Sequence, residues 1–396
     1  MTPIVGTVAR EFMAKKKSGT ARPTRAHAKL TGPDSVTPSR PSESSTTDLD
    51  RALLEGLNRC AAESVRTSGD APERTLIEIL ADDEARIRAA VAANPGPLPA
   101  TVVQAVMREM LSGVRGLRQP VRVIYLGPEY SFSHLAAVQQ FGQSAELVPV
   151  ATIAAVFDAV QRRQADFGVV PIENSTDGRV TDTLDMFARM RVRICGDVQL
   201  RIHHCLLGRC KRTEIREVYS KPQALSQCRT WLARHLPNAA LLEASSTAVA
   251  ARLAAEKPGT AAIASRQAGI QQGLDLIAEN IEDNPHNVTR FAVIGDHVPP
   301  RTGSDRTAVM FEVPHQPGSL ADAMMIFKRR KLNLTWIESF PMPNTPSEYL
   351  FFVEFQGHAS DANVKRGLAD LGRQVVRVEV LGTYPSSAPV GDVGAT

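Results

Sequence analysis

A regular alternation of strand and helix patterns over residues 121–296 constrains the fold of this 396-residue chain more than any other feature. Short apolar runs such as VRVIYLG (121–127) and FGVVPIEN (167–174) predict strands. Segments with apolar residues at helical spacing, such as SFSHLAAVQQF (131–141), separate them. This order predicts a central α/β region with mainly parallel sheets. The segment DVQLRIHHCLLG (197–208) in its middle indicates a crossover between two lobes.

Units of a different character flank this region, so we expect a multidomain protein. Residues 47–118 contain three helical patterns and no strand pattern, which predicts an all-α helical module. After the linker DHVPPRTGSD, residues 305–383 have the order strand, helix, strand, strand, helix, strand, which is the α+β ferredoxin-like motif. Residues 1–46 are basic and rich in Ser, Thr and Pro, which predicts a disordered tail, although a transit peptide has the same bias. We expect residues 384–396 to form a loose tail.

The composition limits the partners and the cell compartment. The formal net charge is only +4, and no apolar run approaches the roughly 18 residues that span a bilayer, so we expect neither a nucleic acid nor a membrane as partner. Five cysteines without framework spacing indicate a reducing cytoplasm. His203, His204, Cys205 and Cys210 suggest zinc ligands, but strand alternation would send neighbours to opposite faces, so we expect no metal.

Four loops at predicted strand ends gather hydroxyl, amide and charged side chains. Their notable residues are Ser131 in GPEYSFS, Glu173, Asn174, Ser175 and Thr176 in PIENSTDG, Ser246 and Thr247 in ASSTA, and Thr289 and Arg290 in NVTRF. Most such residues only cap helices or form turns. Four similar loops at equivalent places nevertheless favour one cleft that binds a small, multiply anionic ligand.

The same loops carry a family resemblance. The segments YLGPEYSFSHLAA, GVVPIENSTDGRVTDTLD, VYSKPQALSQCRTWL, SSTAVAA and LIAENIEDNPHNVTRFAVIG look like the motifs of prephenate dehydratase and follow one another in that family's order. Residues 121–296 therefore resemble the prephenate dehydratase domain. Residues 305–383 resemble the ACT regulatory domain that follows it, and residues 47–118 resemble the chorismate mutase module of the P-proteins.

The resemblance implies a lyase that converts prephenate into phenylpyruvate, with loss of CO2 and water, in phenylalanine biosynthesis. It also implies a bilobal domain like the type 2 periplasmic binding proteins, with the site between the lobes. Because the product gains aromaticity, the enzyme mainly has to orient prephenate and help hydroxide to leave. No cofactor is implied.

The family's roles transfer to matching positions of this sequence. Thr289 takes the central catalytic role, in which its hydroxyl hydrogen-bonds or protonates the leaving oxygen. Arg290 holds a carboxylate or braces the loop, with a structural ion pair as the alternative, and Glu173 acts as an acid or orients its loop. The implied substrate-binding residues are Asn174, Ser175, Thr176, Ser246, Thr247 and Ser131.

The ACT resemblance implies an effector site for phenylalanine at a dimer interface, in a homodimer or a homotetramer. The matching residues are Pro317, Gly318, Ser319 and Leu320 in the turn and Glu338 and Ser339 in a strand. Phe340 replaces the arginine of the family's second effector motif. It either alters effector affinity or selectivity, or only fills the interface.

The helical module lacks the cations with which a chorismate mutase grips its dianionic substrate. An ungapped comparison puts Cys60 at the essential arginine and Glu43 at an upstream arginine, while the expected lysine falls near Ala71. The Arg-Glu pair of the second helix falls near Asp82 and Asp83, and residues 47–118 contain no lysine. Since acids repel a dianion, we expect a degenerate module without mutase activity, kept for dimerisation or packing.

Alternative functions follow from the same motifs. A bifunctional chorismate mutase/prephenate dehydratase and an arogenate dehydratase are the enzyme alternatives. A non-catalytic amino-acid sensor belongs to a different class, and the intact Thr289 motif argues against it.

Overall fold

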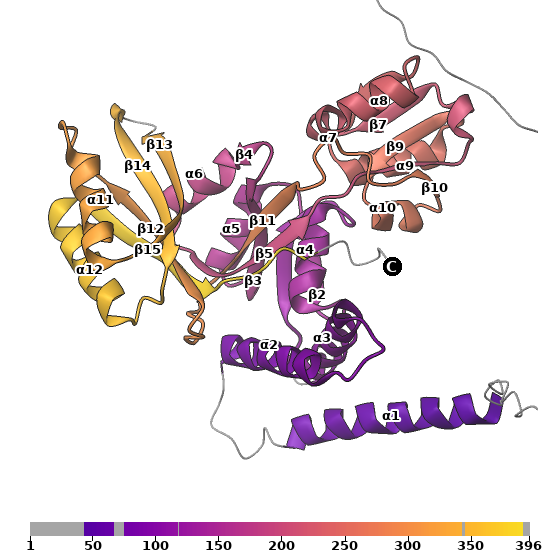
Figure 1. The fold of residues 1–396 in the computed structure, drawn as a ribbon, viewed down its shortest axis with the longest axis horizontal. Helices are drawn as coiled ribbons and strands as arrows, with labels where there is room; N and C mark the ends of the chain where they lie inside the picture. The colour runs from indigo at the N-terminus through magenta and orange to yellow at the C-terminus, as the bar shows by residue number, and fades with distance from the viewer. Residues whose placement is uncertain (1–42, 67–74, 118, 343–344, 391–396) are drawn as a thin grey trace, which may run out of the picture. The chain divides into compact units, whose positions relative to one another are not determined.

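The computed structural model describes residues 43–66, 75–117, 119–342 and 345–390 (Figure 1). The three predicted helices of the N-terminal module are present as α1 (Glu43–Arg66), α2 (Leu76–Ala93) and α3 (Ala100–Gly116). Thr75 and Glu78 form a capping box that fixes the start of α2. Residues 1–42 of the expected N-terminal tail lie outside the described residues, as does Ala71. The prediction of a disordered tail is wrong for residues 43–46, which form the start of α1. Among the described helices, none is long and apolar enough to cross a membrane.

The first lobe of the central region is a sheet with helices packed on it. Its strands are β1 (Arg122–Leu126), β2 (Glu146–Val150), β3 (Phe167–Asn174), β4 (Gly178–Arg179), β5 (Arg193–Arg201) and β11 (Val288–Gly295). Its helices are α4 (Phe132–Phe141), α5 (Ile153–Gln161) and α6 (Thr181–Arg189). The strand order is β5-β11-β3-β1-β2, with β4 paired to β3. This order places the start of β11, which carries Thr289, beside the end of β3.

The second lobe has a sheet of its own, in the order β10-β6-β9-β7-β8. Its strands are β6 (Cys205–Gly208), β7 (Glu217–Ser220), β8 (Ala240–Glu243), β9 (Thr260–Ala264) and β10 (Asp275–Ala278). Its helices are the short η1 (Arg212–Glu214), α7 (Pro222–Gln227), α8 (Arg229–His235), α9 (Thr247–Glu256) and α10 (Arg266–Gln271). The chain passes between the lobes twice, from β5 to β6 and from β10 to β11.

Both sheets are mixed, so the prediction of mainly parallel sheets is wrong. Strands joined through helices pair in parallel, as β1 does with β2 and β3, and β7 does with β8 and β9. The strands next to the two interlobe connections run the other way: β11 is antiparallel to β3 and β5, and β6 is antiparallel to β9 and β10. The crossover segment is also two strands rather than one, because β5 ends at Arg201 and β6 begins at Cys205.

The C-terminal unit has the predicted βαββαβ order. It comprises β12 (Asp305–Glu312), α11 (Ser319–Arg330), β13 (Leu334–Met342), β14 (Thr345–Gln356), α12 (Ala362–Gln374) and β15 (Arg377–Pro385). Its antiparallel strands follow the order β13-β14-β12-β15, and α11 and α12 cover one face (Figure 1). A parallel contact between Gly382 of β15 and Ile194 of β5 joins this sheet to that of the first lobe.

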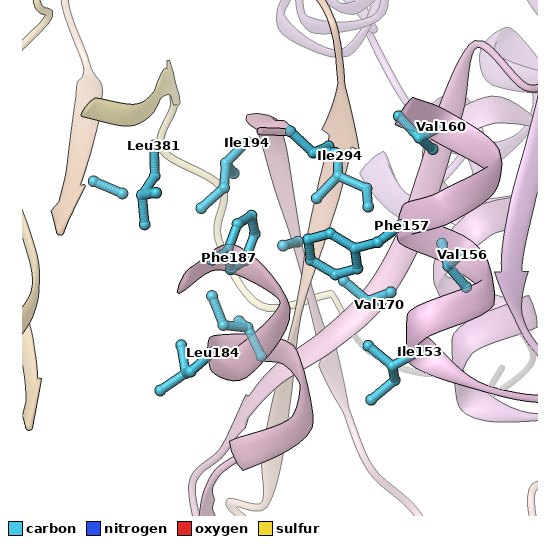
Figure 2. Close-up of a cluster of buried hydrophobic side chains, with 14 of the residues drawn as sticks. Ile153, Val156, Phe157, Val160, Val170, Leu184, Phe187, Ile194, Ile294 and Leu381 are labelled. Atoms are coloured by element: carbon cyan, nitrogen blue, oxygen red, sulfur yellow. The ribbon is translucent and has the colours of Figure 1, made fainter. Parts of the chain in front are cut away.

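One hydrophobic core connects the first lobe to the C-terminal unit. Figure 2 shows Phe157 of α5 and Phe187 of α6 facing each other between the helices and the sheet, and their rings meet edge to face at 4.9 Å. Leu381 of β15 reaches the same cluster. Phe340 is buried in it as well, at 8% exposure. The ACT-like sheet thus shares its helix-free face with the dehydratase-like lobe.

Helices α2 and α3 are part of the first lobe's packing. Leu76 and Leu80 of α2 are buried against sheet residues such as Tyr125 and Phe167. Arg115 of α3 donates to the carbonyl of Phe141 at 2.7 Å. Helix α2 therefore packs against the core of the sheet, and α3 contacts the end of α4.

The C-terminal tail is ordered further than expected. Strand β15 continues to Pro385, and Val390 pairs with Leu200 of β5. Backbone hydrogen bonds join Val390 to Gln199 and to Arg201. The prediction of a loose tail from residue 384 is wrong as far as Val390, because the free edge of β5 offers backbone partners. Residues 391–396 lie outside the described part of the chain.

Candidate active site

Thr289 and Asn174 form the centre of the candidate site. They face each other across the β11–β3 ladder, and the Asn174 amide nitrogen donates to the Thr289 hydroxyl oxygen at 2.7 Å. Thr289 is buried, with 9% exposure. Since a hydroxyl can accept and donate at once, this contact leaves the Thr289 proton available for another oxygen.

The loop after Asn174 holds the amide in this orientation. The Asn174 side-chain oxygen accepts the backbone N–H groups of Thr176 at 2.9 Å and Asp177 at 3.0 Å. With its oxygen occupied by two donors, the amide can only turn its NH2 group toward Thr289. The loop thus fixes the polarity of the Asn174–Thr289 contact.

Asn287 anchors the same loop from the other side, and sequence reasoning did not select it. It is buried, and its side-chain oxygen accepts from the hydroxyls of Ser175 at 3.4 Å and Thr176 at 3.2 Å. The Ser175 hydroxyl also accepts the backbone N–H of Val288 at 2.9 Å. Asn287 lies two residues before Thr289, so its place in the NVTRF motif was the available signal.

Gln227, a second residue that sequence reasoning missed, ties the two lobes together. Its amide nitrogen donates to Asp177 of the first lobe at 3.0 Å, and its oxygen accepts from Asn287 at 3.2 Å. The same oxygen lies 2.9 Å from Nε2 of His204, which places the His204 proton on Nε2. Burial lowers the pKa of His204, so this ring is neutral near pH 7.

The remaining predicted substrate-binding residues lie at helix N-termini. Ser131 caps α4, with its hydroxyl accepting the His134 N–H at 3.4 Å. Ser246 caps α9, accepting the Val249 N–H at 3.1 Å, and the buried Thr247 begins that helix. These hydroxyls therefore perform the capping role, at helix ends whose dipoles favour anions. A cavity of about 480 Å³ between α4 and α10 touches both lobes, but its lining contains none of the predicted site residues.

Arg290 lies in an ion-pair network that reaches the C-terminal unit. Its guanidinium contacts Glu354 of β14 at 2.6 Å, Glu173 at 3.4 Å and Asp197 of β5 at 3.5 Å. Burial alone would lower the pKa of Arg290, but the Glu354 carboxylate raises it. Burial alone would raise the pKa of Glu354, but the charge of Arg290 and the donor Tyr384 hold it below its usual value. Both groups are therefore ionised. The geometry favours a bracing role for Arg290 over a substrate contact.

The predicted effector residues divide into two places. Gly318, Ser319 and Leu320 line a cavity of about 720 Å³ with Met324, Tyr349 and other residues at the start of α11. Gly318 has φ +88°, a conformation that suits glycine in this turn. Pro317 is exposed in the same turn, and Ser339 is exposed on β13. Glu338 of β13 forms an ion pair at 2.7 Å with Arg179 of β4. Arg179 follows the loop that begins at Asn174.

The two arginines of α3 are paired with acids of α2. Arg115 pairs with Asp83, and Arg108 pairs with Glu84 at 3.1 Å. The Cys60 sulfur accepts a hydrogen bond from the Arg86 guanidinium at 3.3 Å. The space enclosed by Asp83, Arg108 and Arg115 is only about 10 Å³, whereas Arg88 and Arg108 line a cavity of about 470 Å³ together with residues of the first lobe.

The suspected zinc residues make other contacts. His203 lies 2.8 Å from Glu282, and His204 contacts Gln227. All five cysteines lie within the described ranges, and none forms a disulfide.

Comparison with known proteins identifies the family. The profile of the prephenate dehydratase family matches residues 123–299. A bifunctional chorismate mutase/prephenate dehydratase from Neisseria gonorrhoeae is 43% identical over 298 residues, which are 74% of this chain and 82% of that protein. A protein of the same name from Pseudomonas aeruginosa is 38% identical over 351 residues, which are 86% of this chain and 95% of that protein.

A solved structure is similar over most of its length. The prephenate dehydratase of Arthrobacter aurescens in complex with L-Phe superposes with a TM-score of 0.63 and 36% identity. The match covers 67% of this chain and 90% of that chain. With the profile match, the two sequence relatives and the buried Asn174–Thr289 pair, this chain belongs to the prephenate dehydratase family and is of its P-protein type.

Proposed function

We propose that this chain converts prephenate into phenylpyruvate, with loss of CO2 and of the C4 hydroxyl as water. The observation that carries the proposal is the buried 2.7 Å contact between Asn174 and Thr289. Two motif residues far apart in sequence meet there in an orientation that leaves a hydroxyl proton to give. A phenylalanine pathway enzyme needs such a donor where hydroxide departs.

Thr289 donates its proton to the leaving oxygen, which departs as water, while the electron pair of the breaking C–CO2 bond completes the aromatic ring; solvent then returns a proton to Thr289. A threonine hydroxyl is a weak acid, so most of the rate enhancement comes from a donor fixed in place before reaction. The N–H of Asn174 polarises the hydroxyl and makes it a better donor, since donors in a chain strengthen one another. Aromatisation supplies the driving force for loss of CO2. No cofactor takes part in this scheme.

The carboxylates of prephenate bind at the hydroxyl-rich helix starts. Ser246 and Thr247 at α9 and Ser131 at α4 offer hydroxyls beside helix N-termini, which favour anions. Ser175 and Thr176 complete the contacts from the loop beside Asn174. We assign the two lobes to a domain like the type 2 periplasmic binding proteins, because two connections join separate mixed sheets.

The C-terminal unit is an ACT domain that binds phenylalanine as inhibitor. The 720 Å³ cavity at Gly318–Leu320 is the supporting feature, and the similar Arthrobacter aurescens enzyme was solved with L-Phe. The buried Phe340 fills the interface with the first lobe and does not line this cavity. Calorimetry should detect phenylalanine binding, and absence of binding heat would remove this part of the proposal.

We place the enzyme in the cytoplasm as a homodimer or homotetramer. The absence of disulfides among its five cysteines supports a reducing compartment. Strand β13 lies at the end of its sheet and exposes Ile337, so its free edge can pair with a second copy. Light scattering on the purified chain measures the assembly, and a monomer would exclude it.

Substitution of Thr289 tests the catalytic assignment. Thr289→Ala should lower kcat for prephenate by about 10²-fold or more, because the positioned donor is lost. Thr289→Ser is the matched control, since it keeps the hydroxyl and should stay within about tenfold of the native rate. Equal turnover by native protein and Thr289→Ala would exclude Thr289 as the proton donor. A native protein that binds prephenate but never converts it would favour the alternative of a non-catalytic amino-acid sensor.

A further inference from the structure

The backbone at Thr289 has an irregular ladder. Thr289 pairs with Asn174 and Arg290 with Glu173, but Phe291 then pairs with Pro171, so the register shifts and Ile172 is skipped. The extra residue lies in β3, and a bulge of this kind bends its own strand and re-aims nearby side chains, here opposite Thr289 and Arg290. Neighbouring side chains on a strand point to opposite faces, so the orientation of Thr289 depends on where Arg290 is held.

Arg290 is held mainly from outside the dehydratase domain. Its shortest contact is to Glu354 at 2.6 Å, whereas the contacts to Glu173 and Asp197 are 3.4 Å and 3.5 Å long. The Glu173 side chain is 30% exposed, but that of Glu354 is only 2% exposed. The buried carboxylate on the C-terminal unit is thus the firmest partner of Arg290.

Glu354 itself has little freedom to move. Besides Arg290, its oxygens accept the hydroxyl of Tyr384 at 2.6 Å, the hydroxyl of Thr335 at 2.8 Å and the guanidinium of Arg306 at 3.1 Å. A carboxylate with four donors can shift only by breaking charge-assisted hydrogen bonds. Tyr384 is itself 2% exposed and packed in the shared core.

We propose that Glu354 and Tyr384, both from the C-terminal unit, are positioning residues of the dehydratase site. They act through Arg290, which fixes the start of β11 opposite the bulge in β3 and thereby aims the Thr289 hydroxyl. The C-terminal unit then has a share in the chemical step and is more than an effector-binding attachment. This inference rests on the proposed function.

Glu354→Gln in the full-length protein tests the inference. The change keeps the shape of the side chain but removes the charge that holds Arg290. We expect kcat for prephenate to fall roughly tenfold or more and KM to change by less than about threefold, since the donor is misaligned while the carboxylate-binding hydroxyls are untouched. Asp370→Asn is the matched control: it breaks the Arg330–Asp370 pair between α11 and α12 of the same unit and should leave kcat unchanged.

A double variant separates positioning from mere stability. If Glu354 acts through Arg290, then Glu354→Gln should add little to the kcat loss of Arg290→Gln, because both changes break one link. Melting curves define a temperature at which every variant is folded, and rates are compared there. If Glu354→Gln does not fold, Tyr384→Phe removes one hydroxyl only and should lower kcat by about two- to fivefold.

Two results would overturn the inference. One is a kcat of folded Glu354→Gln within about twofold of the native value, and the other is full additivity with Arg290→Gln. Neither resembles failure of the proposed function, in which the native protein itself would form no phenylpyruvate from prephenate.

Discussion

At the scale of single residues, the site depends on which atoms are already occupied. Asn174 gives its oxygen to the backbone of Thr176 and Asp177, and so has only N–H groups left for Thr289. Arg290 forms ion pairs with three carboxylates, so few of its N–H groups remain to bind a substrate carboxylate. The hydrogen bonds and ion pairs that each side chain already makes, more than its acid strength, therefore distinguish the roles of Asn174, Thr289 and Arg290.

The Glu354 carboxylate makes stability depend on pH in acid. Its pKa in the folded protein lies below the usual 4.5, so its contribution is complete above that value and is lost as pH falls through the folded-state pKa. The excess melting temperature of native protein over Glu354→Gln should therefore be largest above about pH 5 and shrink toward about pH 3. Calorimetric melts of both proteins across this range measure it.

Arg290, Arg306 and Tyr384 face Glu354, with Asp197 and Glu173 beyond Arg290, and both proteins retain all five groups. The comparison thus isolates Glu354. A difference in melting temperature that stays constant over the whole range would contradict the pH prediction.

At the scale of elements, the joint between β15 and β5 depends on a glycine. A Cβ on Gly382 would meet the backbone of Ile194, which cannot give way. Gly382→Ala should therefore cost about 1–3 kcal/mol of unfolding free energy by forcing the strands apart. Urea unfolding followed by circular dichroism measures this loss.

A helix glycine provides the control for that change. In Gly372→Ala of α12 the new Cβ would lie 3.4 Å from Val378, an ordinary contact, and stability should stay equal or rise by up to about 1 kcal/mol. Equal effects of the two substitutions would mean that the β15–β5 joint is not tight.

Helix α2 is a structural layer of the dehydratase lobe. Leu80 is 7% exposed and packs with residues of the lobe's sheet, so Leu80→Ala should cost about 2–4 kcal/mol. When dehydratase activity is measured at increasing urea concentration, the Leu80→Ala variant should lose activity at a lower urea concentration than the native protein. Val106→Ala on α3, where the side chain is 56% exposed, should change stability by less than about 0.5 kcal/mol. An unchanged activity midpoint in Leu80→Ala would show that the module folds apart from the lobe.

The order of elements could be read from the sequence, but several contacts between elements could not. Helical spacing predicted α1, α2 and α3, and alternation predicted the βαββαβ unit. The antiparallel return of β11 could not be inferred, since strand direction depends on how the two interlobe connections cross. The pairing of Val390 with Leu200 was equally hidden, because PSSAPV has no strand pattern.

The candidate site shows the same division. The sequence motifs identified Thr289 and Asn174 as site residues, but they did not predict the hydrogen bond between the two side chains. Gln227 was missed because its partners Asp177 and Asn287 lie far away in sequence. Glu354 left one signal, a carboxylate inside the apolar strand LFFVEFQ, which indicates a buried charge that needs a partner. The partner itself, Arg290, could only come from the fold.

At the scale of the whole molecule, we predict that the chain carries out the dehydratase reaction and lacks the mutase reaction. Arg108 and Arg115 are occupied by Glu84 and Asp83, so we expect chorismate to rearrange no faster than in buffer. A chorismate assay on the purified full-length chain measures this. Enzyme-like consumption of chorismate would restore the bifunctional alternative.

The central claim is that the intact chain dehydrates prephenate at Thr289. The most direct measurement gives the purified full-length protein prephenate and arogenate in parallel and follows the aromatic product of each. We expect rapid formation of phenylpyruvate from prephenate and little phenylalanine from arogenate, with the prephenate reaction lost in Thr289→Ala. Absence of phenylpyruvate with the native protein, or its unchanged formation by Thr289→Ala, would show that Thr289 does not carry this reaction.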